Sequence, residues 1–216
     1  MDLVLHGYWR SGASYRTRIA LNLKGLDYED RPVNLLAGEQ GQAPYLGLAP
    51  QGLVPALETP EGVLIQSPAI LEWLEETHPD PPLLPRDPQA RAEVRAMAAL
   101  IACDVHPLNN LRVLRALKRD LSASDAQISA WEARWIGDGF RGLEALIARQ
   151  GQDFAWGARP TLADCYLVPQ VYSAERFGVD LEPYPLIRAV TERCRAMEAF
   201  ARAHPDNQPA APAPIR

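Results

Sequence analysis

Residues 56–68 read Ala-Leu-Glu-Thr-Pro-Glu-Gly-Val-Leu-Ile-Gln-Ser-Pro, and this stretch decides the fold class. Two short apolar runs flank residues 59–62, Thr-Pro-Glu-Gly, whose composition is typical of a tight turn, so the stretch predicts a β-hairpin. Ser67 and Pro68 follow directly. A serine at the cap and a proline at the first helical position predict that a helix begins here. The apolar stripe of that helix is Ile70, Leu71 and Leu74.

The residues before the hairpin predict a strand, a helix and a second strand. Residues 3–5 form a short apolar run, and a helical stretch extends from about Ser14 to Lys24 and stops at Gly25. Residues 28–33 predict the second strand, with Pro32 at the edge or end of the sheet. The order β-α-β followed by β-β-α is that of a thioredoxin-like unit, which we assign to residues 1–80.

The second half of the chain follows a different pattern. Residues 81–88 are rich in proline and predict a stiff linker. Beyond them apolar side chains recur at three-to-four spacing, so we expect an all-helical domain over residues 89–206 and an α+β fold class overall. From residue 207 to residue 216 the Pro/Ala-rich tail lacks this periodicity, and we expect it to be mobile. The positions interpreted as helix core are Val94, Met97, Ile101, Ile128, Trp131, Trp135, Phe140, Leu143 and Ile147.

Composition speaks against several functional classes. The chain has 216 residues and a net charge of −5, which gives no basic stripe for nucleic acid. Its apolar runs are far shorter than a membrane span, and no secretory signal precedes the first strand, so we expect a cytoplasmic protein. Cys103, Cys165 and Cys194 contain no CxxC pair and are interpreted as small buried apolar residues. The four histidines show no metal-ligand spacing, and we predict no metal site.

Residues 8–16, Tyr-Trp-Arg-Ser-Gly-Ala-Ser-Tyr-Arg, lie between the first strand and the first helix. In a thioredoxin-like unit this turn lies against the helix N-terminus, where free amides and the helix dipole favour an anion such as a thiolate. The turn contains no cysteine, so a thiolate must arrive with a ligand. Ser11 could then donate its hydroxyl to that sulfur, with simple capping as the alternative. Ser14 is interpreted as a helix cap.

Two further segments could bind a ligand. Residues 51–57, Gln-Gly-Leu-Val-Pro-Ala-Leu, place a proline just before a strand. A cis bond between Val54 and Pro55 would expose the backbone of Val54 as an antiparallel ladder for a peptide-like ligand. Gln66 and Ser67 end a strand and begin a helix, which brings together an amide, a hydroxyl and free backbone amides. That combination suits a carboxylate, with capping again as the alternative.

These three segments resemble the glutathione-binding half of zeta-class glutathione transferases, which include maleylacetoacetate and maleylpyruvate isomerases. The helical half agrees over residues 103–110, Cys-Asp-Val-His-Pro-Leu-Asn-Asn, and residues 161–170, Thr-Leu-Ala-Asp-Cys-Tyr-Leu-Val-Pro-Gln. The resemblance extends from about Leu3 to Pro209. It implies the glutathione transferase architecture, glutathione as cofactor and a homodimer.

The resemblance also implies roles for individual residues. Ser11 would face the glutathione sulfur, and Val54, before a cis Pro55, would pair with the cysteinyl backbone. The γ-glutamyl carboxylate would lie on the 66–67 helix start. The cofactor-binding set implied in this way is Ser11, Gln51, Val54, Pro55, Gln66, Ser67, His106 and Asn110.

The activity implied is cis–trans isomerisation of maleylacetoacetate to fumarylacetoacetate, in which a thiolate adds to the double bond, the bond rotates and the thiolate leaves. The substrate's carboxylate and the developing enolate need cations, and Arg10 and Arg176 are the candidates by their place in the motifs. The zeta pattern usually has another hydroxyl or a cysteine where this chain has Gly12 and Ala13. More of the thiol activation must therefore rest on Ser11 and the helix amides.

Three alternatives remain open from the sequence. The first is maleylpyruvate isomerisation: the short Arg-Ser-Gly turn and residues 174–176 favour it. Leu111 favours maleylacetoacetate, because some maleylpyruvate enzymes have an arginine there. The second is a conjugating transferase or dehalogenase that uses the same glutathione site. The third is a non-catalytic interaction module with this fold.

Overall fold

The computed structural model describes residues 3–212, and contacts divide the chain into two compact units. The first comprises the chain up to Pro82 together with the segment that begins at Ala196, and the second is Leu83–Arg195. The segment from Ala196 on thus groups with the first unit, although residues 196–206 are predicted to belong to the helical domain. The boundaries predicted at residues 80 and 89 stay a prediction. The predicted α+β fold class is confirmed.

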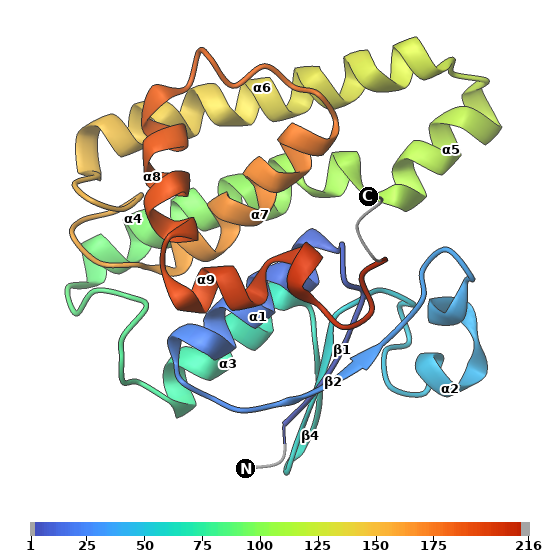
Figure 1. Cartoon of the computed structure of the whole chain (residues 1–216), viewed down its shortest axis with the longest axis horizontal. Helices are drawn as coiled ribbons and strands as arrows, with labels where there is room; N and C mark the ends of the chain where they lie inside the picture. The colour runs from blue at the N-terminus through green and yellow to red at the C-terminus, as the bar shows by residue number, and fades with distance from the viewer. Residues whose placement is uncertain (1–2, 213–216) are drawn as a thin grey trace. The chain divides into compact units, whose positions relative to one another are not determined.

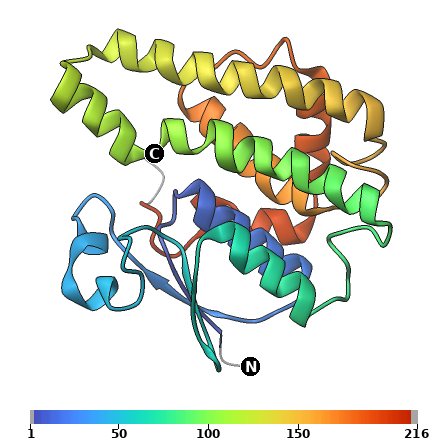
Figure 2. The same cartoon turned by 180° about the vertical axis from the view of Figure 1, so that it is seen from behind.

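The first unit has the predicted strands and helices in the predicted order, with a short helix, α2, added between β2 and β3 (Figure 1). Its four-stranded sheet has the order β2-β1-β3-β4, with β1 parallel to β2 and antiparallel to β3, and β3 antiparallel to β4. Helices α1 and α3 pack side by side on one face of the sheet (Figure 2). The elements are β1 (Val4–Gly7), α1 (Gly12–Leu23), β2 (Glu29–Pro32), α2 (Ala43–Leu46), β3 (Ala56–Thr59), β4 (Gly62–Ile65) and α3 (Ser67–Thr77).

Helix α1 ends as the sequence predicts. Gly25 has φ 66°, a conformation that glycine adopts without steric cost, and it follows the C-cap residue Lys24. The helix buries Ile19, Ala20 and Leu21 completely. Pro32 ends β2, which is an edge strand, where the missing amide proton of proline costs no sheet hydrogen bond.

The C-terminal segment of the first unit packs on α1. Helix α9 (Glu198–Ala203) lies along it, and the side-chain amide of Asn22 donates to the Ala199 carbonyl over 2.9 Å. The predicted mobile tail begins just after this helix. Its first part is anchored, because the buried Gln208 side chain donates to the carbonyls of Arg202 and His204. Residues 213–216 of that tail lie outside the described residues.

The second unit is helical. A π-helical segment (Leu100–Val105) continues its first helix, and a short 3-10 helix (Pro107–Asn109) follows before the next α-helix. The positions predicted as core are buried, except that Trp131 and Trp135 are half-buried. A capping box begins the helix at Leu162, because the Thr161 amide donates to the Asp164 carboxylate over 2.7 Å. The helices are α4 (Pro88–Ala99), α5 (Leu111–Leu121), α6 (Asp125–Gln150), α7 (Leu162–Arg176) and α8 (Pro185–Arg195).

The interpretation of the cysteines is wrong for one of the three. Cys165 and Cys194 are buried and no disulfide joins any of the three, but Cys103 is exposed. Cys103 lies on the outer side of the π-helical segment, whose inner side is taken by Ile101 and Val105.

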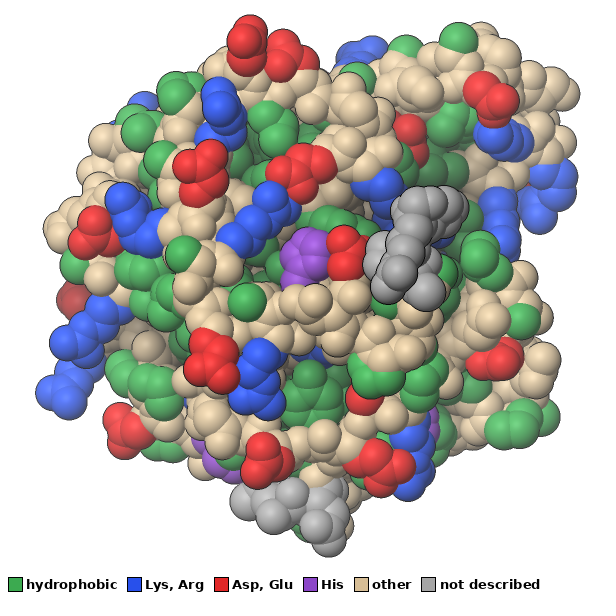
Figure 3. Space-filling model, viewed as in Figure 1, with side chains coloured by type: hydrophobic (Ala, Val, Ile, Leu, Met, Phe, Trp, Pro, Cys, Tyr) green, Lys and Arg blue, Asp and Glu red, His purple; other side chains and the backbone are tan. Residues whose placement is uncertain are grey.

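Surface charge and hydropathy agree with the composition. Acidic and basic side chains are interspersed over the face shown in Figure 3. Among residues 3–212, no helix combines the length and the apolar character needed to cross a membrane.

Candidate functional site

The strand register brings the three predicted segments of the first unit to one end of its sheet. His6 of β1 pairs with Ala56 of β3, and Ala56 pairs with Ile65 of β4. The turn that carries Ser11 follows β1, the Val54–Pro55 bond directly precedes β3, and Gln66 directly follows β4. Antiparallel pairing thus brings together segments that are about 55 residues apart in the chain.

The turn before α1 is closed by backbone and serine hydrogen bonds. The Ser11 amide donates to the Tyr8 carbonyl over 2.9 Å. Ser11 is the N-cap residue, and its side-chain oxygen accepts from the Ser14 amide over 3.2 Å. The interpretation of Ser14 as the cap is therefore wrong. Ser14 lies fully buried inside the first helical turn, and its own oxygen accepts from the Tyr8 amide over 3.3 Å.

The capping role of Ser11 leaves its proton available. A serine hydroxyl has one proton and two lone pairs, and the Ser14 amide takes only one lone pair. Within the described residues the Ser11 hydroxyl donates to no acceptor, so it can donate to an anion placed at the start of α1. The neighbouring Arg10 guanidinium lies 5.2 Å from the centre of the Trp9 ring and is half-exposed.

The loop before β3 presents unpaired backbone. The peptide bond between Val54 and Pro55 is cis, as the resemblance to zeta-class transferases implies. The Tyr45 hydroxyl donates to the Leu53 carbonyl over 2.7 Å, and burial raises the pKa of that hydroxyl, which keeps it a neutral donor. Within residues 3–212 the amide and carbonyl of Val54 make no hydrogen bond. They are available to an extended peptide ligand.

Gly52 fixes the course of this loop. Its φ is 64°, and a Cβ atom at this position would lie 3.0 Å from the Gln40 carbonyl oxygen. The backbone conformation and the close approach both require glycine here.

The start of α3 brings two predicted residues together. The Gln66 side-chain amide donates to the Gln51 side-chain oxygen over 2.5 Å. Gln66 is the N-cap residue with φ 69°, and Ser67 is the first helical residue, so the prediction of Ser67 as the cap is wrong. No side chain caps this helix, which leaves the amides of its first turn for an external acceptor.

The other predicted binding residues belong to the second unit. His106 is half-buried at the end of the π-helical segment, and its amide donates to the Ile101 carbonyl over 2.9 Å. Asn110 is the N-cap of α5, and its side-chain oxygen accepts from the Arg112 amide over 3.1 Å. Within the described residues its two amide protons have no acceptor, so they are available to a ligand.

Two residues outside the predicted site, Trp131 and Asn109, hold this loop in place. The Trp131 indole donates to the Leu108 carbonyl over 2.9 Å, and the Asn109 side chain donates to the Val105 carbonyl over 3.1 Å. Helical spacing alone led us to interpret Trp131 as core. The signal that could have found it is its indole N–H, which needs an acceptor when it is partly buried.

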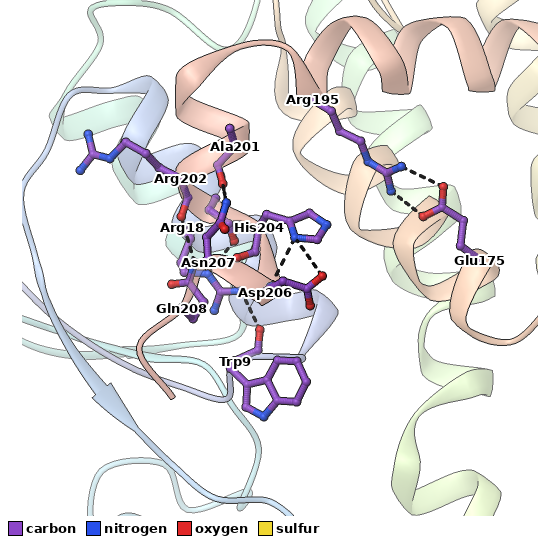
Figure 4. A network of polar contacts seen from close by, with 11 residues as sticks. Trp9, Arg18, Glu175, Arg195, Ala201, Arg202, His204, Asp206, Asn207 and Gln208 are labelled. Atoms are coloured by element: carbon purple, nitrogen blue, oxygen red, sulfur yellow. Dashed lines mark hydrogen bonds and ion pairs between the residues drawn. The ribbon is translucent and has the colours of Figure 1, made fainter. Parts of the chain in front are cut away.

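Arg176 is the last residue of α7 and is exposed. Its guanidinium lies 4.5 Å from the centre of the Phe177 ring. Burial raises the pKa of Glu132, and the positive charge of Arg176 partly offsets that rise. The preceding Glu175 is held by a bidentate pair with Arg195 of α8, at 2.8 and 2.7 Å (Figure 4).

The donors at the sheet end of the first unit fit one kind of ligand. The Ser11 hydroxyl and the amides at the start of α1 suit an anion such as a thiolate. The unpaired Val54 backbone suits an extended peptide, and the amides of α3 suit a carboxylate. A short peptide that carries both a thiol and a carboxylate matches all three.

The similarity of this chain to known proteins supports a ligand of this kind. Residues 5–82 match the glutathione S-transferase N-terminal domain, and residues 139–198 match the glutathione S-transferase C-terminal domain. The chain is 54% identical to a maleylpyruvate isomerase of Ralstonia sp, over 95% of this chain and 98% of that protein. It is 53% identical to a maleylacetoacetate isomerase of Pseudomonas aeruginosa, over 97% of this chain and 99% of that protein.

Solved structures extend the comparison. A holo maleylpyruvate isomerase, described as a bacterial glutathione S-transferase of the zeta class, superimposes with a TM-score of 0.94 at 53% identity, covering 98% of this chain and all of that one. A maleylacetoacetate isomerase from Anaeromyxobacter dehalogenans, with bound dicarboxyethyl glutathione and citrate, gives a TM-score of 0.89 at 48% identity, with 98% of each chain covered. The chain belongs to the zeta class of the glutathione S-transferase family.

Proposed function

We propose that this protein is a glutathione-dependent cis–trans isomerase that converts maleylacetoacetate to fumarylacetoacetate. The observation that carries the proposal is the meeting of the Ser11 hydroxyl, the unpaired Val54 backbone and the uncapped start of α3 at one end of the sheet. Relatives that are 53–54% identical along almost their whole length act on maleyl acids, which supports the substrate class.

Glutathione supplies a thiolate that adds to the substrate's double bond and leaves again after the bond has rotated. The Ser11 hydroxyl donates to the sulfur and, with the amides of α1, favours its ionised form. The Val54 backbone holds the cysteinyl part in extended form, next to Pro55. Gln66 and Ser67 orient the γ-glutamyl carboxylate, and Gln51 fixes the Gln66 amide.

The substrate side of the reaction rests on cations and on the loop of the second unit. Arg10 and Arg176 bind the substrate carboxylate and stabilise the enolate that develops next to the attacked carbon. His106 and Asn110 line the glutathione or substrate side. Dicarboxyethyl glutathione, bound in the Anaeromyxobacter enzyme, is a thioether of glutathione with a four-carbon diacid. This thioether has the connectivity expected after a thiolate adds to the double bond of a maleyl acid.

A second candidate substrate is maleylpyruvate. The relative from Ralstonia and the holo structure of the zeta class carry that name, at 54% and 53% identity. Leu111 still favours maleylacetoacetate. We further propose that the protein is cytoplasmic and forms a homodimer. Size-exclusion chromatography with light scattering tests the dimer directly.

The deciding experiment compares both maleyl substrates with the purified protein, with and without glutathione, by loss of the substrate's absorbance. We expect turnover only with glutathione, and faster turnover of maleylacetoacetate. Faster turnover of maleylpyruvate would reassign the substrate, and no turnover of either would reject the isomerase. Product that retains glutathione, or halide release from chlorinated acids, would instead indicate a conjugating transferase or a dehalogenase.

A further inference from the structure

We propose that Arg18 is a positioning residue that holds the Trp9–Arg10 peptide of the site turn against the end of helix α9. Through this residue the C-terminal segment of the first unit sets the geometry beside Ser11. The inference rests on the proposed function in one respect, namely that Ser11 faces the glutathione sulfur. Figure 4 shows Trp9 and Arg18 together with residues of α9 and of the segment that follows it.

Arg18 makes two directed hydrogen bonds from a buried position. Its side chain belongs to α1 and is 1% exposed. Its Nε donates to the Ala203 carbonyl over 3.0 Å, and one terminal nitrogen donates to the Trp9 carbonyl over 2.9 Å (Figure 4). The guanidinium also lies 5.7 Å from the centre of the Tyr15 ring. A planar guanidinium holds its donors in fixed directions, so the two carbonyls are held relative to each other.

The bond to the Trp9 carbonyl orients a whole peptide group. The Trp9–Arg10 peptide is planar and trans, so its amide proton points opposite to its carbonyl oxygen. With the carbonyl turned to Arg18, the Arg10 amide faces the other side of the turn. Within residues 3–212 that amide donates to no acceptor. It lies one residue before Ser11 and adds a donor to those available to an anion there.

The other atoms of the turn do not fix this peptide by themselves. The Tyr8 carbonyl and the Ser11 amide are joined to each other, and Ser14 holds the Tyr8 amide. Those bonds define the two ends of the turn and leave the Trp9–Arg10 peptide between them. Among the described residues, Arg18 donates the hydrogen bond that the Trp9 carbonyl accepts. Without Arg18, the peptide could rotate and carry the Arg10 amide away from Ser11.

The far end of the connection is itself anchored. Ala203 is the last residue of α9, and the residues after it turn back over the helix end. Asn207 donates to the Ala201 carbonyl over 2.8 Å, and Gln208 donates to the Arg202 and His204 carbonyls over 2.9 and 2.8 Å (Figure 4). These bonds hold the backbone around the Ala203 carbonyl, so Arg18 joins the site turn to a fixed point.

The test uses Arg18→Lys and Arg18→Met, with Asn22→Ala as the matched control. Asn22 also bonds α1 to α9, through the Ala199 carbonyl, but does not touch the turn. We expect Arg18→Met to lower kcat by about 10- to 100-fold, because small displacements of reacting groups carry penalties of this order. Lysine cannot reach both carbonyls, so we expect Arg18→Lys to lower kcat as well. Asn22→Ala should lower the melting temperature and leave kcat unchanged.

A second readout separates positioning from general loosening. The ultraviolet absorbance of the thiolate, titrated with pH in the protein–glutathione complex, gives the pKa of the bound thiol without any turnover. We expect a higher thiol pKa in both Arg18 variants and a wild-type value in Asn22→Ala. Wild-type kcat and thiol pKa in the Arg18 variants, or equal changes in Asn22→Ala, would overturn the inference.

Two further outcomes are covered. If the Arg18 variants do not fold, Gln208→Ala tests the same connection from the far end, with smaller changes in the same direction. An unchanged kcat and thiol pKa in that variant would overturn the inference. If the wild-type protein binds glutathione but turns over neither maleyl acid, the proposed isomerase fails, and the thiol titration still decides the role of Arg18.

Discussion

The backbone amide of Ser14 donates to the side-chain oxygen of Ser11 over 3.2 Å, so the hydroxyl proposed to face the glutathione sulfur is also the cap of helix α1. The two roles use different parts of the group, since the cap takes a lone pair and the sulfur takes the proton. They can therefore be separated by substitution.

Ser11→Ala should remove both roles. We expect a loss of about 1 kcal/mol in the free energy of unfolding from the missing cap, and a fall in kcat of about 100-fold from the missing donor. Ser11→Asp keeps a good capping oxygen but has no proton to donate at neutral pH and adds a negative charge. We expect it to unfold like the wild type and to be at least as inactive as Ser11→Ala. Substantial isomerase activity in Ser11→Asp would contradict the role of the proton.

Replacing Gln66 should weaken glutathione binding without lowering the stability of the protein. Its φ of 69° is unfavourable for any residue other than glycine, so Gln66→Gly relieves local strain. We expect a melting temperature equal to or above that of the wild type, together with weaker glutathione binding by calorimetry, because the amide held by Gln51 is gone. Gln51→Ala is the control that leaves the backbone conformation unchanged. Unaltered affinity in both variants would remove these residues from the site.

The parts of the structure that sequence could predict are those decided locally. The hairpin over residues 56–65 follows from a turn composition between two apolar runs, and the end of α1 follows from Gly25. The choice between Ser11 and Ser14 as the cap could not be made in this way. Two serines three residues apart offer the same local signal, and the outcome depends on where β1 ends and the turn closes on Tyr8.

Long-range partners explain the other differences. The acceptors of Arg18 are backbone carbonyls at positions 9 and 203, which leave no trace in residue type or spacing. The exposure of Cys103 depends on a π-helical segment that rotates the residues out of the α-helical pattern. The three site segments, in contrast, could be assigned before their meeting at one end of the sheet was known, because each carries its own polar groups or proline.

Lys24 and Glu75 form a buried ion pair in the first unit. Their charged atoms are 2.6 Å apart, the two side chains are 0% and 6% exposed, and Lys24 also donates to the Pro81 carbonyl over 2.9 Å. Lys24→Met leaves the carboxylate buried without this cation, and we expect a loss of about 3 to 5 kcal/mol in urea unfolding. The double variant Lys24→Met/Glu75→Gln should recover much of that loss, because the charge is removed as well. A double variant no more stable than Lys24→Met would contradict this account.

Asp164 should make the stability of the protein depend on pH. Burial raises the pKa of its carboxyl from 3.8 to about 6, against hydrogen bonds from Ala155 and Thr161 that lower it. The folded state therefore binds this proton more tightly than the unfolded state. The resulting stabilisation is complete below about pH 4 and is lost as the pH rises through about 6, a change of about 3 kcal/mol.

The measurement compares the wild type with Asp164→Asn, which stays neutral at every pH. We expect the difference in their free energies of unfolding to decrease as the pH rises from 4 to 7. Asp138→Asn, at an exposed position of the same unit, controls for the removal of one charge. A difference between wild type and Asp164→Asn that does not change with pH would show that the carboxyl titrates equally in both states.

Gly139 allows α6 to approach the π-helical segment that precedes His106. A Cβ atom at Gly139 would overlap the Cγ2 atom of Val105, and both positions lie in the second unit. We expect Gly139→Ala to lower the free energy of unfolding by about 1 to 3 kcal/mol, although alanine favours a helix more than glycine does. Gly142→Ala, one turn further along, meets Leu100 at 3.3 Å and should be close to neutral.

Removing the overlapping atoms should reverse the effect of the added methyl group. Val105→Ala alone opens a cavity and destabilises the protein. In the double variant Gly139→Ala/Val105→Ala the new methyl group fills part of that cavity. We therefore expect the double variant to be more stable than the sum of the two single losses predicts, by a coupling of at least about 0.5 kcal/mol in chemical denaturation. Strictly additive losses would mean that α6 moves away from the segment as a whole and that the close approach at Gly139 is not what sets their spacing.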